Sequence, residues 1–351
     1  MKKFTPGLVT ITAFQLIFLM NIYAQQVVKF EIKPNEQKVD VLIGGKFFTA
    51  YLYPNSIEKP VLYPLQTASG ILVTRGFPLN PRPNERTDHP HHIGMWFTYG
   101  DVDGLDFWNN SYAIPDSAKD KYGSIKHQRI VAAEDGKTSG KLSVAANWVD
   151  IKGKILLKEQ TTFLFSGDAT HRFIDRTTTL TAQQERVSMK DNKEGIMGMR
   201  VTRELEIPSD KPEMFTDAKG NPTRVAVLNN KGVTGNFLTS EGKAGNDAWG
   251  TRGKWCLMYG KITNQDVSIA IIDHPGNPGY PTYWHARGYG LFAANNLGQE
   301  ALSAGKVKLN YALEAGKSAT FKYRIVITNG STPSSDQLNK MAADFSKQAE
   351  L

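Results

Sequence analysis

Hydrophobic and polar residues alternate with a period of two along much of this chain. Phe321, Tyr323, Ile325 and Ile327 stand at every second position with polar residues between most of them, and positions 39–43 show a similar pattern. A segment of this kind buries one face and exposes the other, which is typical of a half-buried β-strand. Further strands are expected over 46–53, 141–149, 155–165, 171–180, 199–207, 254–259, 267–272 and 307–313.

The composition of these segments indicates one fold class. They are rich in Val, Ile, Thr, Phe and Tyr, and turn signals such as Asp135-Gly136 separate them. They do not alternate with long helical patterns, which argues against a parallel βαβ sheet. The sequence therefore predicts an all-β fold, a large antiparallel β-sandwich.

One helix is predicted, at the C-terminus over 334–350. Its four apolar residues from Leu338 to Phe345 follow the spacing i, i+3, i+4, i+7 and so share one face. Ser334 and Gln337 make a candidate capping box at its start. We expect this helix to pack as a lid on the sandwich.

The first 24 residues are typical of a secretory signal peptide. Lys2 and Lys3 precede an apolar run, and a small residue, Ala24, stands at the expected cleavage site. The run is too short for a transmembrane anchor, and no cysteine follows it to carry a lipid. We therefore expect an exported protein, periplasmic or extracellular, whose mature part is a single domain over 25–351 without a membrane span.

Cysteine content and net charge exclude a disulfide-stabilised fold and argue against one class of partner. The only cysteine is Cys256, so no intramolecular disulfide can form and the fold must depend on its core. Because Lys2 and Lys3 lie in the signal segment, the mature chain keeps 40 of 42 basic residues and all 34 acidic ones. The resulting net charge of about +6 is scattered through strand-like segments, which argues against nucleic-acid binding.

The densest chemistry lies in the loop-like region 80–126. Three of the seven histidines fall within four residues there, followed by tryptophans and further carboxylates. Imidazole titrates near neutrality, so such a cluster suits proton transfer or metal binding. The alternative is that one or two of these histidines only hydrogen-bond the backbone of a tight turn. The candidate residues are Asp88, His89, His91, His92, Trp96, Asp106 and Trp108.

A second candidate stretch, 273–287, follows the predicted strand 267–272. The strand would deliver its last residues to the end of a sheet, and a loop rich in Pro and Gly would project outward, as pocket-forming loops do. The alternatives are an Asx-type turn with an exposed histidine and a cross-strand aromatic contact. The candidates here are Asp273, His274, Trp284, His285 and Arg287.

Two shorter stretches complete the candidate set. Glu194 precedes Arg200, and these groups would supply an acid/base and a binder of a sugar hydroxyl or carboxylate, with Arg75 as a second binder. An exposed salt bridge is the competing explanation. Trp249 lies among Asp, Asn and Arg residues, a combination that suits the apolar faces and polar rims of sugars. It could instead cap the core.

Several motifs together resemble the exported bacterial proteins labelled PmoA-like. They lie at 62–65, 73–75, 88–97, 100–102, 106–108, 193–195 and 273–295. The label suggests a methane oxygenase subunit, which is a multi-pass membrane protein, whereas this chain has no spanning segment after its signal peptide. Its long antiparallel pattern and histidine-bearing loops are similar to the galactose-mutarotase-type β-supersandwich, which hosts sugar epimerases, lyases and glycosidases.

We therefore predict an exported carbohydrate-active enzyme, a glycoside hydrolase, lyase or epimerase. It would act on a sugar or oligosaccharide by His and carboxylate acid–base chemistry, without a cofactor, in one pocket where the candidate loops converge. The candidate catalytic residues are His91, His92, Glu194, His274 and His285. The candidate substrate-binding residues are Arg75, Asp88, His89, Trp96, Asp106, Trp108, Arg200, Trp249, Asp273, Trp284 and Arg287.

Two alternatives stay open at this point. The first is a metalloenzyme in which His89, His91, His92, His274 or His285 ligates a divalent metal such as zinc, copper or iron, because imidazole suits these ions. The second is a non-catalytic glycan-binding module, in which the aromatic residues bind and the histidines only shape loops.

Overall fold

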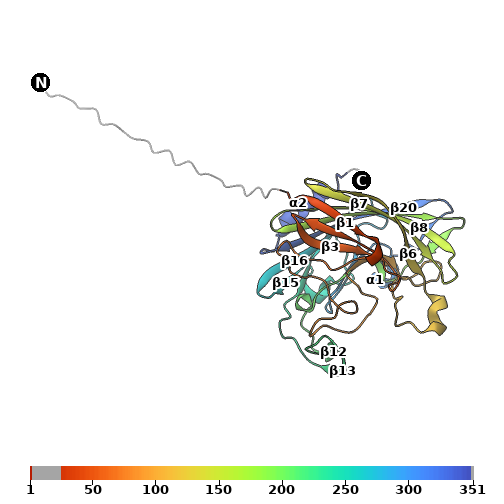
Figure 1. The fold of residues 1–351 in the computed structure, drawn as a ribbon, viewed down its shortest axis with the longest axis horizontal. Helices are drawn as coiled ribbons and strands as arrows, with labels where there is room; N and C mark the ends of the chain where they lie inside the picture. The colour runs from red at the N-terminus through yellow and green to blue at the C-terminus, as the bar shows by residue number, and fades with distance from the viewer. Residues whose placement is uncertain (2–24, 349–351) are drawn as a thin grey trace.

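Two large antiparallel β-sheets dominate the computed structural model, which describes Met1 and residues 25–348 (Figure 1). One sheet has the strand order β1-β2-β3-β4-β5-β11-β18-β17, and the other has the order β14-β15-β16-β20-β9-β8-β7-β6. The predicted all-β class is therefore confirmed. After Met1, the expected signal peptide lies outside the described residues. Among the described residues, no helix is long and apolar enough to cross a bilayer.

The first sheet, named here the site sheet, contains β1 (Val28–Lys33), β2 (Lys38–Ile43), β3 (Lys46–Leu52), β4 (Val61–Leu62), β5 (Met95–Tyr99), β11 (Gly195–Arg200), β17 (Tyr283–Arg287) and β18 (Leu291–Asn295). The second, the helix-covered sheet, contains β6 (Ser124–Glu134), β7 (Ser139–Val149), β8 (Ile155–Gly167), β9 (His171–Ala182), β14 (Asn236–Thr239), β15 (Trp255–Ile262), β16 (Gln265–Asp273) and β20 (Ser318–Asn329). Two small sheets pair β10 (Val187–Met189) with β19 (Tyr311–Leu313) and β12 (Glu213–Thr216) with β13 (Pro222–Val227). The helices are α1 (Gln299–Leu302), α2 (Ser335–Phe345) and the short 3₁₀ turns η1 (Pro34–Glu36), η2 (Asp116–Lys121), η3 (Arg203–Leu205) and η4 (Gly245–Ala248).

The main core fills the space between the two sheets. On β16, Val267, Ile269 and Ile271 face this core, whereas Ala270 and Ile272 face the other side of the sheet. This alternation is the period-two pattern that the sequence shows, because successive side chains of a strand point to opposite faces.

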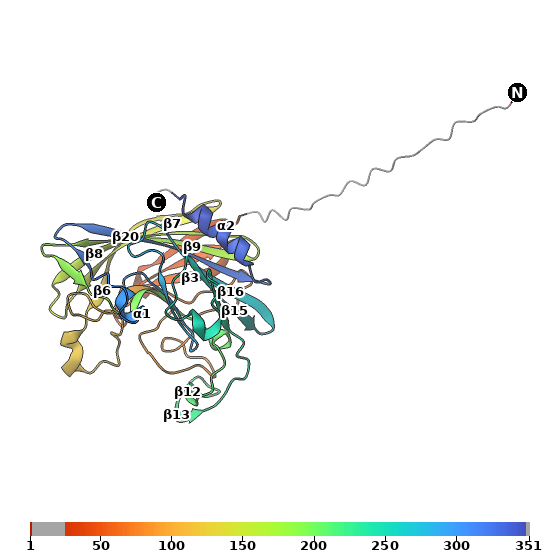
Figure 2. The same cartoon turned by 180° about the vertical axis from the view of Figure 1, so that it is seen from behind.

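The C-terminal helix α2 begins as predicted. The Ser334 side chain accepts from the Gln337 backbone while the Gln337 side chain accepts from the Ser334 backbone, which is a complete capping box. Leu338 and Phe345 pack with Trp255 on the outer face of the helix-covered sheet. The helix ends at Phe345 rather than at the predicted position 350. Figure 2 shows α2 lying along one side of the sandwich, while the β12–β13 hairpin and the long connections lie on the other.

Some predicted boundaries are wrong, and burial explains most of the errors. The strand expected over 199–207 is β11, which ends at Arg200 and is followed by η3, and the one expected over 307–313 is only the short β19. The loop-like region 80–126 contains β5, and the loop expected within 273–287 ends in β17. Both strands are buried on both faces over nearly all their length, so neither alternates in sequence.

The outer face of the site sheet carries its own apolar cluster. Trp96 of β5 and Leu291 and Ala293 of β18 are buried there against Trp108 and Ile93, which come from the long connections before and after β5. The histidine-bearing connection 76–94 therefore folds back over this face, and the fold has four successive layers: connections, site sheet, helix-covered sheet and α2.

Candidate functional site

A stack of aromatic rings stands on the outer face of the site sheet. The His89 ring lies parallel between the rings of Tyr289 and His92, with centroid separations of 5.0 and 4.8 Å. The His92 ring in turn stacks on Trp96 at 5.0 Å. Trp108 packs edge-on against His92 and Trp96, at 5.8 and 5.2 Å. The predicted histidine and tryptophan residues thus form one continuous cluster.

Gly198 of β11 makes room for the two indoles. It pairs with Trp96 across the β5–β11 ladder. A Cβ at position 198 would lie 2.7 Å from the Trp96 ring and 2.9 Å from the Trp108 ring, closer than packed carbon atoms allow. The lack of a side chain at this position therefore lets both rings approach the sheet.

Asp88 fastens the histidine loop to the sheet. Its Oδ1 accepts hydrogen bonds from Arg75 Nη1 at 3.0 Å and Arg200 Nη2 at 2.7 Å, and its Oδ2 lies 2.5 Å from His89 Nδ1. Burial alone would raise the pKa of Asp88, but Arg200, His89 and Arg75 hold that pKa well below its usual value. Asp88 is therefore ionised and serves as the counterion of two guanidinium groups.

Arg75 lies beneath the loop rather than in an open pocket. It is 1% exposed, and its two terminal nitrogens donate to the carbonyl oxygens of Arg86, Asp88, His89 and His92. The sequence suggested substrate binding for Arg75. Its terminal nitrogens instead contact the loop backbone and the Asp88 side chain, and only Nε has no partner among the described residues, so the contacts favour a role in positioning the histidines.

The buried histidines of the cluster are neutral. Burial, reinforced by the positive charge of Lys59, lowers the pKa of His91 to about 2. Burial and Arg287 lower the pKa of His285 to about 3, and burial with the neighbouring His91 and Arg200 sets the pKa of His92 well below its usual value. At neutral pH these imidazoles are therefore uncharged, and each has one N–H donor and one acceptor nitrogen.

Several buried ring nitrogens of the cluster have no hydrogen-bond partner among the described residues. They are Nε2 of His91 and His92, Nδ1 of His285, and Nε1 of Trp96 and Trp108. Leaving one buried polar atom unsatisfied costs about 1–3 kcal/mol, and buried polar atoms are rarely left so. Five such atoms in neighbouring rings mark the place where a polar ligand would be recognised.

Glu194 and His285 stand at the edge of this cluster. Glu194 Oε2 lies 3.8 Å from His285 Nδ1, while its other carboxylate oxygen pairs with Lys193. The His285 ring stacks over Trp108 at 6.4 Å. The structure therefore brings the predicted carboxylate and a fourth histidine to the ring cluster, although positions 92, 194 and 285 are far apart in sequence.

Lys59 is a residue of this site that no pattern in the sequence marks. Its side chain is buried, its Nζ donates to the Trp108 carbonyl at 2.9 Å, and it lies 6.0 Å from the centre of the Trp96 ring. Burial lowers the pKa of Lys59 to about 7. Together with His91 it lines a pocket of about 280 Å³. Tyr289, which completes the ring stack, carried no signal in the sequence either.

Three further candidates lie beside the cluster. Arg287 follows His285 by two residues on β17, so it shares the same face, and its guanidinium lies 5.0 Å from the Trp249 ring. Asp106 accepts from the backbone N–H groups of Trp108 and Asn109, both at 2.9 Å. Trp249 and Arg287 are thus placed at the rim, whereas Asp106 shapes the turn that carries Trp108.

Three candidates lie away from the cluster, so the expected convergence of all the loops is wrong. The His274 ring packs against Phe345 of α2 at 5.2 Å, on the opposite side of the sandwich. Asp273 is buried and accepts from Asn277 and Asn296, and burial raises its pKa to about 7. Trp284 belongs to the core between the sheets, because strand alternation points it away from the face that carries His285.

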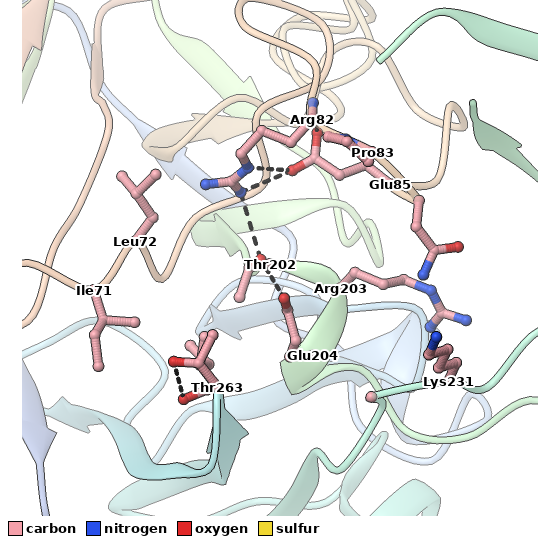
Figure 3. Close-up of a pocket in the computed structure, with 13 residues that line it drawn as sticks. Ile71, Leu72, Arg82, Pro83, Glu85, Thr202, Arg203, Glu204, Lys231 and Thr263 are labelled. Atoms are coloured by element: carbon pink, nitrogen blue, oxygen red, sulfur yellow. Dashed lines mark hydrogen bonds and ion pairs between the residues drawn. The ribbon is translucent and has the colours of Figure 1, made fainter. Parts of the chain in front are cut away.

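A pocket of about 620 Å³ beside η3 contains charged residues but no part of the cluster (Figure 3). Glu85 accepts there from the backbone of Gly76 and Phe77 and from Arg82, whose own Nη2 also donates to the Thr74 carbonyl. Thr202 donates to Glu204. These groups hold the 76–85 loop in place and leave few free donors or acceptors for a ligand.

The geometry gives no support to a histidine-ligated metal. Among the residues that the structure describes, no group of three or more His, Cys, Asp and Glu side chains is disposed to hold a metal ion. The rings of His89 and His92 are parallel and face to face, which suits stacking and does not point two nitrogens at one ion.

Residues 38–343 match the model of a family of unknown function (DUF6807), and the chain belongs to this family. No curated protein matches the chain. No match to PmoA-like proteins is among these findings, so that resemblance stays a prediction.

Similar solved structures include sugar-related proteins. A galactose mutarotase-like protein from Clostridium acetobutylicum is 12% identical, with 87% of this chain and 99% of that chain covered and a TM-score of 0.36. The galactose 1-epimerase of Lactobacillus acidophilus is 10% identical, with 88% and 100% covered and a TM-score of 0.32. The GH36 α-galactosidase of Geobacillus stearothermophilus is 12% identical, with 86% of this chain but 40% of that chain covered and a TM-score of 0.41. Similarity at this level does not transfer a reaction.

Proposed function

We propose that this member of a family of unknown function is an exported carbohydrate-active enzyme. It would carry out acid–base chemistry on a sugar or oligosaccharide, as a glycoside hydrolase, lyase or epimerase. The observation that supports the proposal most is the set of five unpartnered ring nitrogens, from three neutral imidazoles and two indoles, in one buried aromatic cluster.

The cluster has the properties that sugar recognition requires. Trp96 and Trp108 are fully buried, but their unpartnered indole N–H groups could donate to sugar hydroxyls. A neutral imidazole can accept a hydrogen bond from a hydroxyl at one nitrogen and donate at the other. Trp249 at the rim is 37% exposed, and its ring would suit the apolar C–H face of a sugar.

The proposed proton transfers use the imidazoles and Glu194. His91, neutral when the site is empty, would remove a proton from the sugar. His92 Nδ1 accepts from Arg200 Nη1 at 3.2 Å, so the Nε2–H of His92 would donate to the sugar. Glu194, which stands beside His285, would act as the acid/base counterpart on the other side of the ring cluster. Arg75 and Arg200 would hold the histidine loop through Asp88 while this happens. General acid–base catalysis of this kind typically contributes about 10²–10⁴-fold to a rate.

The proposal is tested by screening the mature protein against glycosides, uronides and oxidised sugars with mass spectrometric detection. Glutamine variants of His91, His92, Glu194 and His285 are then compared on the substrate found. Replacing a true proton-transfer residue should lower kcat by about 10²–10⁴-fold, while the melting temperature of the variant stays close to that of the wild type.

Two histidines outside the cluster provide matched controls. His171 sits at the start of β9 beside Asp168, and His274 packs on α2, so glutamine at either position should leave kcat unchanged. Loss of turnover only in variants that also lose their fold would contradict the proposal. Ligand binding without turnover would favour a glycan-binding module instead.

A further inference from the structure

We infer that the substrate is an acidic sugar whose carboxylate binds beside Lys59 and His91, in the pocket of about 280 Å³ next to the ring cluster. This inference rests on the proposed function, because it names the substrate class of the same site. It is carried by the unpaired cations of the site and by the geometry of the pocket.

Below about pH 7, Lys59 is a buried cation without a counterion among the described residues. It is only 3% exposed, and among the described residues no carboxylate lies within 4.0 Å of its Nζ. The ammonium group has three donors, and the Trp108 carbonyl accepts one of them. Buried charges in proteins are normally paired, so an unpaired ammonium at a pocket wall indicates an anionic partner from outside the chain.

The two acids whose charges act on Lys59, Asp106 and Glu58, form their bonds with other groups. Glu58 accepts from Ser124 at 2.6 Å and pairs with Lys126 at 3.2 Å. Asp106 accepts from the backbone of Trp108 and from Asn109. Neither carboxylate can turn toward the Lys59 ammonium without breaking these bonds.

Positive charge also exceeds negative charge in the wider site. Asp88 is shared by two guanidinium groups, those of Arg75 and Arg200. Glu194 is paired with Lys193. Arg287 contacts the Trp249 ring and forms no ion pair with a carboxylate among the described residues. The site therefore has a surplus of cations that a neutral sugar would leave uncompensated.

An acidic substrate would also change the state of the histidines. The charges of Lys59, Arg200 and Arg75 add to burial in holding the pKa of His91 below its usual value. An opposite charge nearby favours the protonated form of an imidazole, so a bound carboxylate would raise that pKa toward neutrality. His91 would then become an effective proton-transfer group when the correct substrate is present.

The shape of the pocket is compatible with this role. His91 and Lys59 are joined on its wall by apolar residues such as Ile57 and Ile93 and by the polar side chains of Asn110 and Ser111. A pocket that is largely apolar with a few converging polar groups is typical of small-molecule sites, and its volume is near the lower end of their range.

The test compares one set of ligands in two charge states. Uronic-acid oligosaccharides are prepared from polyuronides, and half of the material is carboxyl-reduced to the neutral sugars. Native mass spectrometry then measures binding of both pools to the mature protein. We expect the acidic pool to bind about tenfold more tightly or better, and the Lys59→Met variant to lose this preference while its affinity for the neutral pool stays within about threefold. The Lys59→Arg variant, which keeps the charge, should retain part of it.

The exposed residue Lys154 provides the matched control. Lys154→Met removes an exposed cation paired with Glu185 and should leave both affinities unchanged. Equal affinity of the wild-type protein for the two pools, no binding of the acidic pool, or an acid preference that survives in Lys59→Met would each overturn the inference. Turnover of neutral glycosides without any acid preference would overturn it and leave the proposed function standing. Acid binding that depends on Lys59, without turnover of any bound sugar, would overturn the proposed function and leave the binding site standing.

Discussion

Replacing Lys59 with methionine should stabilise the folded protein at neutral and mildly acidic pH. Methionine has a similar length and no charge, so it fills the same space without a buried ammonium. Burial lowers the pKa of Lys59 from 10.5 to about 7. By linkage, this difference corresponds to about 5 kcal/mol of unfavourable free energy for the charged folded form.

One lost hydrogen bond opposes this gain. The Trp108 carbonyl accepts from Lys59 Nζ at 2.9 Å and would be left without that donor in the variant. An unsatisfied buried carbonyl costs about 1–3 kcal/mol, so the net gain at pH 6 should be about 2–4 kcal/mol in the free energy of unfolding.

The gain should depend on pH with a definite sign. Between pH 7 and 10.5 the unfolded chain keeps the Lys59 proton that the folded wild-type chain has released. The stability of the wild type therefore rises with pH across this window by about 1.4 kcal/mol per pH unit from this residue, and Lys59→Met lacks this contribution. The advantage of the variant should thus shrink above pH 7 and vanish near pH 9.

Guanidinium chloride unfolding of the wild type, Lys59→Met and Lys154→Met at pH 6, 7, 8 and 9 checks this expectation. The exposed Lys154 should give a difference from the wild type that is small and independent of pH. A Lys59→Met protein that is less stable at pH 6, or a difference that stays constant from pH 6 to 9, would refute the reasoning that a buried ammonium without a counterion destabilises the fold.

Three further outcomes are expected. Because the pKa values of His91 and His285 lie at about 2 and about 3, each residue should lower the free energy of unfolding of the wild type by about 1.4 kcal/mol per pH unit as pH falls below 6.5. Unfolding curves from pH 7 to 4 should therefore show a smaller decrease for His91→Asn than for the wild type. Gly198→Ala should lower the free energy of unfolding by about 1–3 kcal/mol and reduce turnover, since its Cβ would collide with the Trp96 ring; a fully active variant would contradict this. Leu338→Ala should lower the free energy of unfolding by about 2–5 kcal/mol. It should leave kcat per folded molecule unchanged, because α2 lies on the other side of the sandwich.

The sequence predicted the fold best where a strand has one buried and one polar face. Positions 321–327 alternate because β20 faces the core on one side, and the strand was found there. Strands β5 and β18 are buried on both faces, so they have no alternation and resemble loops or short apolar runs. These two strands were therefore harder to predict than β2 and β3 of the same sheet, although the candidate site lies against them.

The candidate site also contains some residues that local sequence could predict and others that it could not. His89, His91 and His92 were found because they are neighbours in the chain. Choosing between Trp284 and His285 requires the register of β17, since adjacent residues of a strand face opposite sides. The role of Lys59 depends on which acids lie near it in space, and this information is not contained in any local pattern.

The stability of the unliganded site and its proposed preference for an anion would have a common origin. The connection 76–94 covers the outer face of the site sheet, and several of its backbone carbonyls are satisfied by Arg75 rather than by a neighbouring strand. Each guanidinium brings a positive charge into a buried region. Among the described residues, Asp88 is the carboxylate within 4.0 Å of both Arg75 and Arg200. Burial, together with the charges of Lys59, Arg200 and Arg75, lowers the pKa of His91 and keeps its imidazole neutral. A bound carboxylate would offset this charge and restore the basicity of His91 in one step, so the folding of the loop and the recognition of an acidic sugar would depend on the same electrostatic imbalance.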